Sequence, residues 1–180
     1  MRPFRATRIS GTSGIALLLF FLSSIACEEK SPLDLSYGAF DQRPGKGWRR
    51  VAEKGDFPGA AALIDEYIES HEGLGESQRV NLNFHAGQMY AFAGDVKTAI
   101  ERFTRAVYVE EPAEFPLRWN AYVHATIAFL ERDMDRLKEC REQIVRGPTF
   151  RGEKANLDVV DRLIRHFDEP YAKAYGAPGA

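Results

Sequence analysis

The dipeptide Gly94-Asp95 divides residues 81–112 into two helical segments joined by a tight turn. Glycine suits the left-handed backbone position that ends a helix, and aspartate is a preferred N-cap of the helix that follows. The same dipeptide recurs at Gly55-Asp56. The sequence therefore predicts a succession of helical hairpins.

The hairpin around Gly94 resembles a tetratricopeptide (TPR) repeat, a helix hairpin that stacks with copies of itself and usually binds proteins. In such a repeat, Gly87 and Ala99 would lie where the helices cross most closely, and Tyr90 and Phe103 would fill the wider space beside the crossing. Pro112 is expected to end the second helix. The positions that carry the resemblance are Gly87, Tyr90, Gly94, Ala99, Phe103 and Ala106.

Two further hairpins match the TPR pattern less closely. One surrounds Gly55, and the other joins a helix over 118–131 to a helix over 134–145, with Arg132 in place of the turn glycine. An amphipathic helix over 156–167 would cap the array, since a stack of repeats needs a polar outer face. The resemblance implies an all-α, TPR-like helical-hairpin solenoid of about three repeats plus a C-terminal capping helix.

The N-terminus resembles a bacterial lipoprotein leader. Residues 1–26 combine three arginines with an apolar run too short to span a bilayer comfortably, which takes about 20 residues, so a cleaved signal peptide is favoured over a retained anchor. The small residues before Cys27 resemble a lipobox, although Ser24 stands where leucine is preferred. Cys27 is the predicted lipidation site, and the alternative is a soluble exported protein with a free N-terminal thiol.

Three regions follow from this division: a signal peptide over 1–26, a flexible tether over 27–46 and a TPR-like helical domain over 47–180. The tether is rich in proline, glycine and charge, and a coil of that length would reach about 25 Å. The chain holds 24 basic and 26 acidic residues. Loss of the leader's three arginines leaves 21 basic residues and a net charge of about −5, which disfavours nucleic acid as a partner.

The resemblance also implies a concave groove lined by the first helix of each hairpin. Trp119 belongs either to this groove or to the core, and the sequence leaves both open. A mixed aromatic and amide surface suits an apolar peptide or helix. The predicted groove residues are Arg49, Asn81, Phe84, Gln88, Trp119 and Tyr122.

No catalytic motif, cofactor motif or metal-ligand spacing stands out in the sequence. His124 and Cys140 could face each other within one hairpin as a nucleophile pair, but core packing of Cys140 or an intermolecular disulfide is also open. His85 is expected to be structural or part of the groove. Asp65 and Glu69 share a helix face, where a solvated acidic surface competes with a divalent-cation site.

The leading prediction is a membrane-tethered adaptor or scaffold of the bacterial cell envelope, exported and facing the periplasm or cell exterior. Its partner would be another envelope protein, presented as a peptide or helix. The alternative is a periplasmic enzyme or small-ligand-binding protein built on a helical solenoid. An open groove with exposed aromatics would favour the adaptor, whereas a deep pocket with several titratable groups would favour the alternative.

Overall fold

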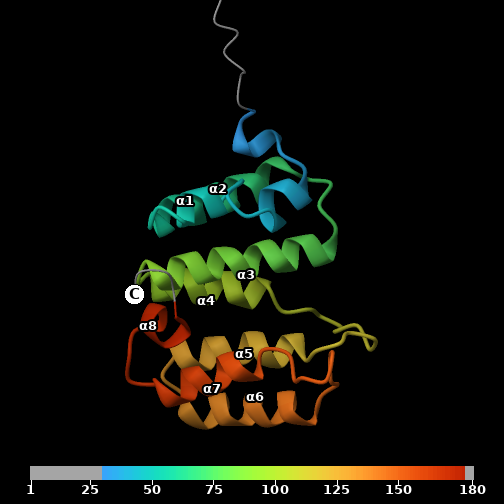
Figure 1. Ribbon diagram of the computed structural model, residues 1–180, viewed down its shortest axis with the longest axis vertical. Helices are drawn as coiled ribbons and strands as arrows, with labels where there is room; N and C mark the ends of the chain where they lie inside the picture. Colours follow the sequence, from blue (N-terminus) through green and yellow to red (C-terminus); the bar gives the residue numbers. More distant parts are fainter. Residues whose placement is uncertain (1–29, 177–180) are drawn as a thin grey trace, which may run out of the picture.

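The computed structural model describes residues 30–176, and it is helical throughout its regular elements apart from one isolated β-bridge between Phe150 and Glu153 (Figure 1). The all-α prediction is confirmed over these residues. Cys27 and the leader lie outside the described residues. The elements are η1 Pro32–Asp34, η2 Gly38–Gln42, α1 Arg49–Ala52, α2 Phe57–Ser70, α3 Glu76–Phe92, α4 Val96–Arg105, α5 Trp119–Leu130, α6 Met134–Arg146, α7 Leu157–Arg165 and α8 Tyr171–Tyr175.

Three hairpin turns share one construction. Gly55, Gly94 and Arg132 all have left-handed backbones, with φ of 81°, 83° and 62°. The aspartate that follows each turn caps the next helix: in α4, for example, the Asp95 side chain accepts a hydrogen bond from Thr98 N–H at 3.1 Å. Arg132 takes the left-handed position despite its side chain, so the Asp cap and the apolar faces determine this turn without a glycine.

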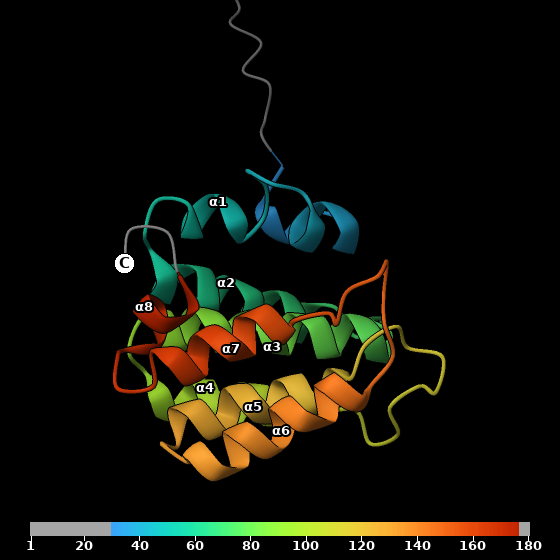
Figure 2. The same cartoon turned by 60° about the horizontal axis from the view of Figure 1, so that its bottom comes forward.

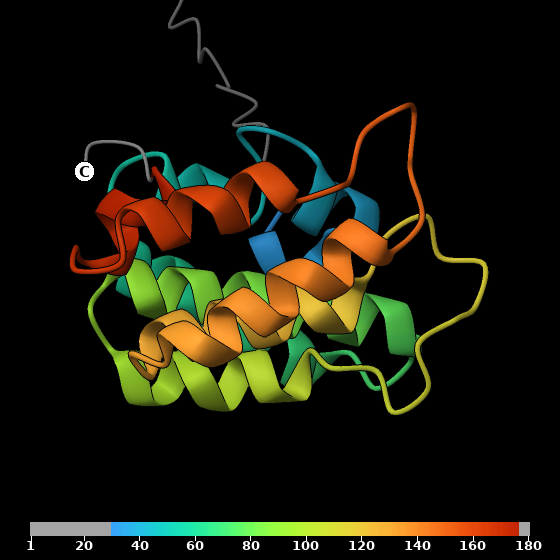
Figure 3. The same cartoon turned by 90° about the horizontal axis from the view of Figure 1, so that it is seen from below.

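The helices form successive layers, with α1 and α2 at one end, α3 and α4 in the middle, and α5 to α7 at the other end (Figure 1). Helix α7 lies beside α6 and also contacts α5, as the view from below shows (Figure 3). Helix α8 then turns back to contact α3 (Figures 1 and 2). The C-terminal capping helix was predicted over 156–167, and α7 matches this within two residues at each end.

The described residues form two hydrophobic cores, an N-terminal one that includes α2 and a C-terminal one that includes α5. Helix α3 contributes to both. Leu82 and Ala86 pack with Ile64 of α2 in the N-terminal core, whereas Phe84 and Ala91 belong to the C-terminal core. Gly87 lies against α4: a Cβ there would come within 2.9 Å of the Phe103 ring. The close approach predicted at Gly87 is confirmed, but the nearest side chain is Phe103, which was expected beside the crossing, and not Ala99. Ala99 is fully buried, as expected.

Helix α4 ends earlier than predicted. It stops at Arg105 rather than near Pro112, and residues 106–118 form an irregular connection to α5. The Tyr108 backbone is held by the Asn120 side-chain amide, which accepts from Tyr108 N–H and donates to Tyr108 C=O, both at 2.9 Å. These bonds replace the helical hydrogen bonds that would otherwise carry α4 further.

The predicted flexible tether is wrong over the described residues 30–46. Phe40 is fully buried and its ring stacks on Tyr67 of α2, with ring centroids 3.8 Å apart. The Tyr67 hydroxyl donates to the Leu35 carbonyl at 2.9 Å. Apolar residues within this segment, including Leu33 and Tyr37, pack onto the N-terminal core. The segment is therefore a folded part of the domain.

We expect Ala99→Leu to lower the free energy of unfolding by about 1–3 kcal/mol, because it adds three carbons at a fully buried position of α4. Glu101→Leu places the same side chain on the exposed face of α4 and should stay within about 0.5 kcal/mol of wild type. Urea denaturation of both variants measures the difference. Equal stability of the two leucine variants would show that Ala99 is not tightly packed.

Candidate binding groove

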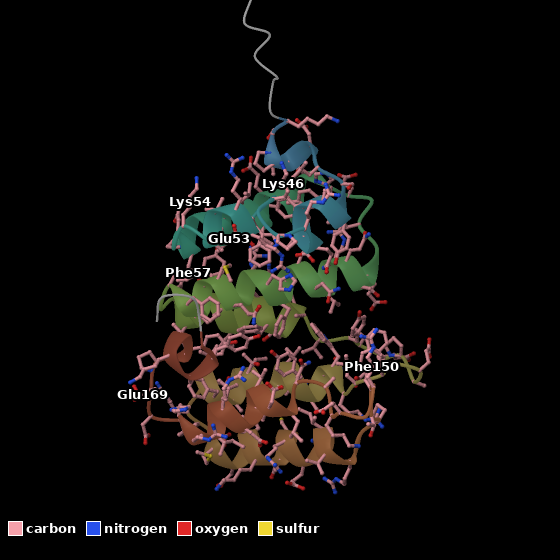
Figure 4. All side chains as sticks on the ribbon, viewed as in Figure 1. Lys46, Glu53, Lys54, Phe57, Phe150 and Glu169 are labelled. Carbon is pink, nitrogen blue, oxygen red and sulfur yellow. The ribbon has the colours of Figure 1, made fainter. Side chains whose placement is uncertain are left out.

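A partly open pocket of about 560 Å³ lies between α1, the C-terminal end of α3 and α8. Its walls include Trp48, Phe57, Met89 and Phe92, so they are largely apolar. Glu53 lies at the end of α1, and Figure 4 shows it on the same side of the molecule as Phe57. The pocket therefore combines an apolar wall with polar groups from the chain around α1.

The N-terminal segment shapes one side of this pocket through Asp41. This carboxylate is fully buried and accepts hydrogen bonds from Trp48 Nε1 at 2.9 Å and from His85 Nδ1 at 2.7 Å. The Arg49 side chain lies 4.2 Å from the Trp48 ring centroid, and its Nε donates to the Asp41 carbonyl at 2.6 Å. Asp41 thus joins the N-terminal segment, α1 and α3, and fixes the pocket residues Trp48 and Arg49.

The pKa of Asp41 is lowered from its ordinary value. Burial alone would raise this pKa, because a charge in an apolar site is poorly solvated. The hydrogen bond and charge of His85, the Trp48 hydrogen bond and the nearby Arg49 outweigh burial. The folded protein therefore holds Asp41 ionised.

Only part of the predicted groove lines this pocket. Arg49 and Gln88 do so, whereas Asn81 donates a hydrogen bond to the Tyr37 hydroxyl at 3.3 Å, away from the pocket. The six predicted residues are thus divided between the pocket, the N-terminal segment and the core, and they do not form one concave surface. The TPR resemblance did not include the N-terminal segment and α8, which cover parts of these helices.

Two predicted groove aromatics, Phe84 and Tyr122, lie in the C-terminal core instead, and Trp119 packs against it. The Phe84 ring packs against Trp119 and Tyr122, with centroids 5.0 and 5.2 Å away, and Tyr122 is buried. Trp119 is half-buried, and its indole N–H donates to the Ala106 carbonyl at 2.7 Å. Trp119 thus packs against the C-terminal core while remaining partly exposed, and it does not line the pocket.

The C-terminal helix covers the surface beside these aromatics. Tyr171 packs against Phe92 of α3 and Phe129 of α5, with ring centroids 5.5 and 5.8 Å apart. The hydroxyls of Tyr175 and Tyr122 lie 3.3 Å apart. Burial raises the pKa of both Tyr171 and Tyr122 well above the ordinary tyrosine value. Tyr171 and Tyr122 are packing residues that stay protonated, and Tyr175 lines the pocket.

The pKa shifts of His124 and Cys140 do not favour a cysteine thiolate nucleophile. Burial raises the pKa of the Cys140 thiol and lowers that of His124, so both side chains are held neutral. A thiolate is the reactive form of cysteine. Cys140 is buried among the core residues of α6, in line with the packing alternative.

Asp65 forms an ion pair and a hydrogen bond with other side chains, so it is not part of an exposed acidic cluster. It lies 2.7 Å from the Arg102 guanidinium and accepts a hydrogen bond from the Tyr90 hydroxyl at 2.7 Å. These contacts bridge α2, α3 and α4. Among the described residues, no group of three His, Cys, Asp or Glu side chains is placed to hold a metal ion.

Comparisons with protein-family models, with curated proteins and with solved structures found no match to this chain.

We expect Asp41→Asn to reduce the free energy of unfolding at neutral pH by about 1–3 kcal/mol, because it removes a buried, hydrogen-bonded charge. The folded-state pKa of Asp41 is depressed, so this stabilisation is present above the unfolded pKa of about 3.9 and is lost as pH falls through the folded pKa. The stability gap between wild type and variant should therefore narrow in acid.

Denaturation curves at pH 7 and in the acid range measure this gap. Asp34→Asn, on an exposed residue of the same segment, is the matched control and should remain within about 0.5 kcal/mol of wild type. A gap that does not depend on pH would contradict the assigned role of the Asp41 charge.

Proposed function

We propose that this chain is a membrane-tethered interaction module of the bacterial cell envelope that binds an apolar segment of a partner protein in the pocket between α1, α3 and α8. The pocket carries the proposal: an apolar wall that includes Trp48 and Phe92 is bordered by polar groups such as Gln42 and Glu53. Apolar walls with a polar border suit one face of a peptide or helix.

The TPR-like interpretation is part of this proposal. Three successive hairpins, α1 with α2, α3 with α4 and α5 with α6, each have a left-handed turn residue followed by an aspartate cap. The small position at Gly87 against Phe103 also supports it. The pocket differs from a groove shared by all the repeats, because α8 covers the surface beside α5.

The membrane tether in this proposal is the lipid anchor on Cys27, and it is inferred from the leader; both lie outside the described residues. No helix among residues 30–176 is long and apolar enough to cross a bilayer. In this proposal the acyl chains on Cys27 hold the domain at the membrane, since each buried methylene contributes about 0.8 kcal/mol.

A second candidate is a small-ligand-binding protein or enzyme, and the pocket volume favours it. About 560 Å³ lies within the range of roughly 300–1,000 Å³ that is typical of small-molecule sites. The charged side chains in the pocket wall are Arg49 and Glu53, and Arg49 is already bound to the Asp41 carbonyl. A small molecule that co-purifies with the protein, and is lost when the pocket is filled, would support this candidate over the adaptor.

We expect Ala52→Trp to lower partner capture at least about tenfold, equivalent to about 1.4 kcal/mol, because the indole would occupy the pocket that Ala52 lines. Lys54→Trp introduces the same ring on an exposed residue just after α1, outside the pocket wall, and should capture normally. The measurement is affinity capture from gently solubilised membranes, followed by a direct Kd with the identified partner. Equal affinity of both variants would reject the pocket as the binding site.

We expect Cys27→Ser to move the protein from the membrane fraction to the soluble fraction, because serine cannot carry the thioether-linked lipid. Cell fractionation and intact mass of the wild-type protein provide the measurement. Cys140→Ser is the matched control, since it replaces the other cysteine in the chain. Membrane association that survives Cys27→Ser, with no lipid mass on the wild type, would reject the tether.

A further inference from the structure

A second pocket, of about 430 Å³, lies at the N-terminal end of the described chain and is surrounded by positive charge. The other residues in its wall are uncharged: Ser31, Pro32, Leu35, Ala39 and Gly47. Figure 4 shows Lys46 at the same end of the molecule as the chain around residue 30. We call the four basic residues in the wall the basic pocket; they are Lys30, Arg43, Lys46 and Arg50.

The fold fixes the backbone beside Lys46. Gly47 has a left-handed φ of 48°, and a Cβ there would lie 2.1 Å from the Phe40 carbonyl oxygen, so the chain can reverse here only with glycine. Phe40 is fully buried, which anchors the other side of this reversal. Lys46 therefore projects from a folded segment rather than from a free tether.

The distance to Cys27 is short. Lys30 is three residues after Cys27, and three residues span at most about 11 Å. That length is comparable to the Debye length of about 8 Å at physiological ionic strength. An acyl chain on Cys27 would consequently hold the basic pocket close enough to a lipid surface to sense its charge.

We propose that the basic pocket binds the phosphates of anionic phospholipid headgroups and orients the domain on the membrane. This inference rests on the tether of the proposed function. Phosphate oxygens accept several charge-assisted hydrogen bonds, and lysine and arginine are the side chains that supply them. Each cation near an anionic bilayer strengthens binding about fivefold.

The charge of the rest of the chain would orient the domain on the membrane. Glu28 and Glu29 precede Lys30 and oppose the attraction, but residues 28–50 hold five basic and four acidic side chains and so keep a net charge of +1. The chain after the leader is acidic overall, with 21 basic and 26 acidic residues. An anionic surface would attract the basic pocket and repel the acidic remainder, which fixes one end of the domain toward the lipid.

The test uses vesicle flotation with the full chain carrying Cys27→Ser in every protein compared, so that acylation plays no part. The vesicles are phosphatidylcholine alone, or the same lipid with one molecule in three replaced by phosphatidylglycerol. The preference for phosphatidylglycerol is the ratio of the two partition coefficients. The leader is present in every protein, so its own affinity for lipid cancels when these ratios are compared.

Neutralising Lys30, Arg43 and Lys46 to glutamine should lower this preference at least about tenfold. All three are exposed, and a thermal melt checks that the variant folds. The matched control neutralises Lys54, Lys97 and Arg105, which are also exposed but lie outside the basic pocket, and should keep the preference. A second variant, Lys30→Arg with Arg43→Lys and Lys46→Arg, keeps the charge and should bind as the parent does.

Equal loss in the pocket and control variants would overturn the proposal, because general charge would then explain binding. Loss in the charge-conserving variant would also overturn it. Inorganic phosphate that abolishes the preference, where sulfate at matched ionic strength does not, would reassign the pocket to free phosphate. None of these results bears on Cys27 acylation, which cell fractionation tests separately.

Discussion

The structure depends on one helix that must be buried on two sides. Along α3, Leu82 and Ala86 face the N-terminal core, while Phe84 and Ala91 face the C-terminal core. A helix in this position cannot keep a wide polar face, and nine of its residues are buried. Removing α3 would leave both cores open, since each is completed by its side chains.

The close contact at Gly87 follows from this double burial. Phe103 of α4 lies against the α3 backbone at a point where a Cβ would meet its ring, which brings α4 close to the helix that it covers. The two helices therefore present a thin middle layer, and α2 and α5 can pack on either side of it (Figure 1). The absence of a side chain at Gly87 thus allows the close packing of α3 and α4.

Residue preferences that act over a few positions were sufficient to predict the hairpin turns. Gly94 followed by Asp95 identifies a turn because both residue preferences act within a few residues of chain. The third turn was also predictable, although Arg132 is an unusual residue there, because apolar periodicity on both sides required two helices. Helix α7 was recognisable for the same reason, from its apolar stripe.

The parts that sequence reasoning missed depend on contacts distant in the chain. Asp41 lies in a segment with the composition of a linker, but its partner His85 is 44 residues away. Apolar residues such as Phe40 were the available signal, and they were outweighed by the proline, glycine and charge around them. The groove assignment failed similarly, since Tyr122 meets Tyr175 across 53 residues. Periodicity on a single helix does not reveal what covers it.

The return of α8 to α3 also changes how the chain holds together as a whole. In a linear array each unit touches only its neighbours, so the ends can fray independently. Here Tyr171 packs on Phe92, which ties the last helix to the central one and spans the intervening hairpin. Opening the C-terminus would expose part of the middle layer, and the free energy of local opening therefore rises toward that of global unfolding. The contact makes a short array of hairpins behave as one cooperative unit.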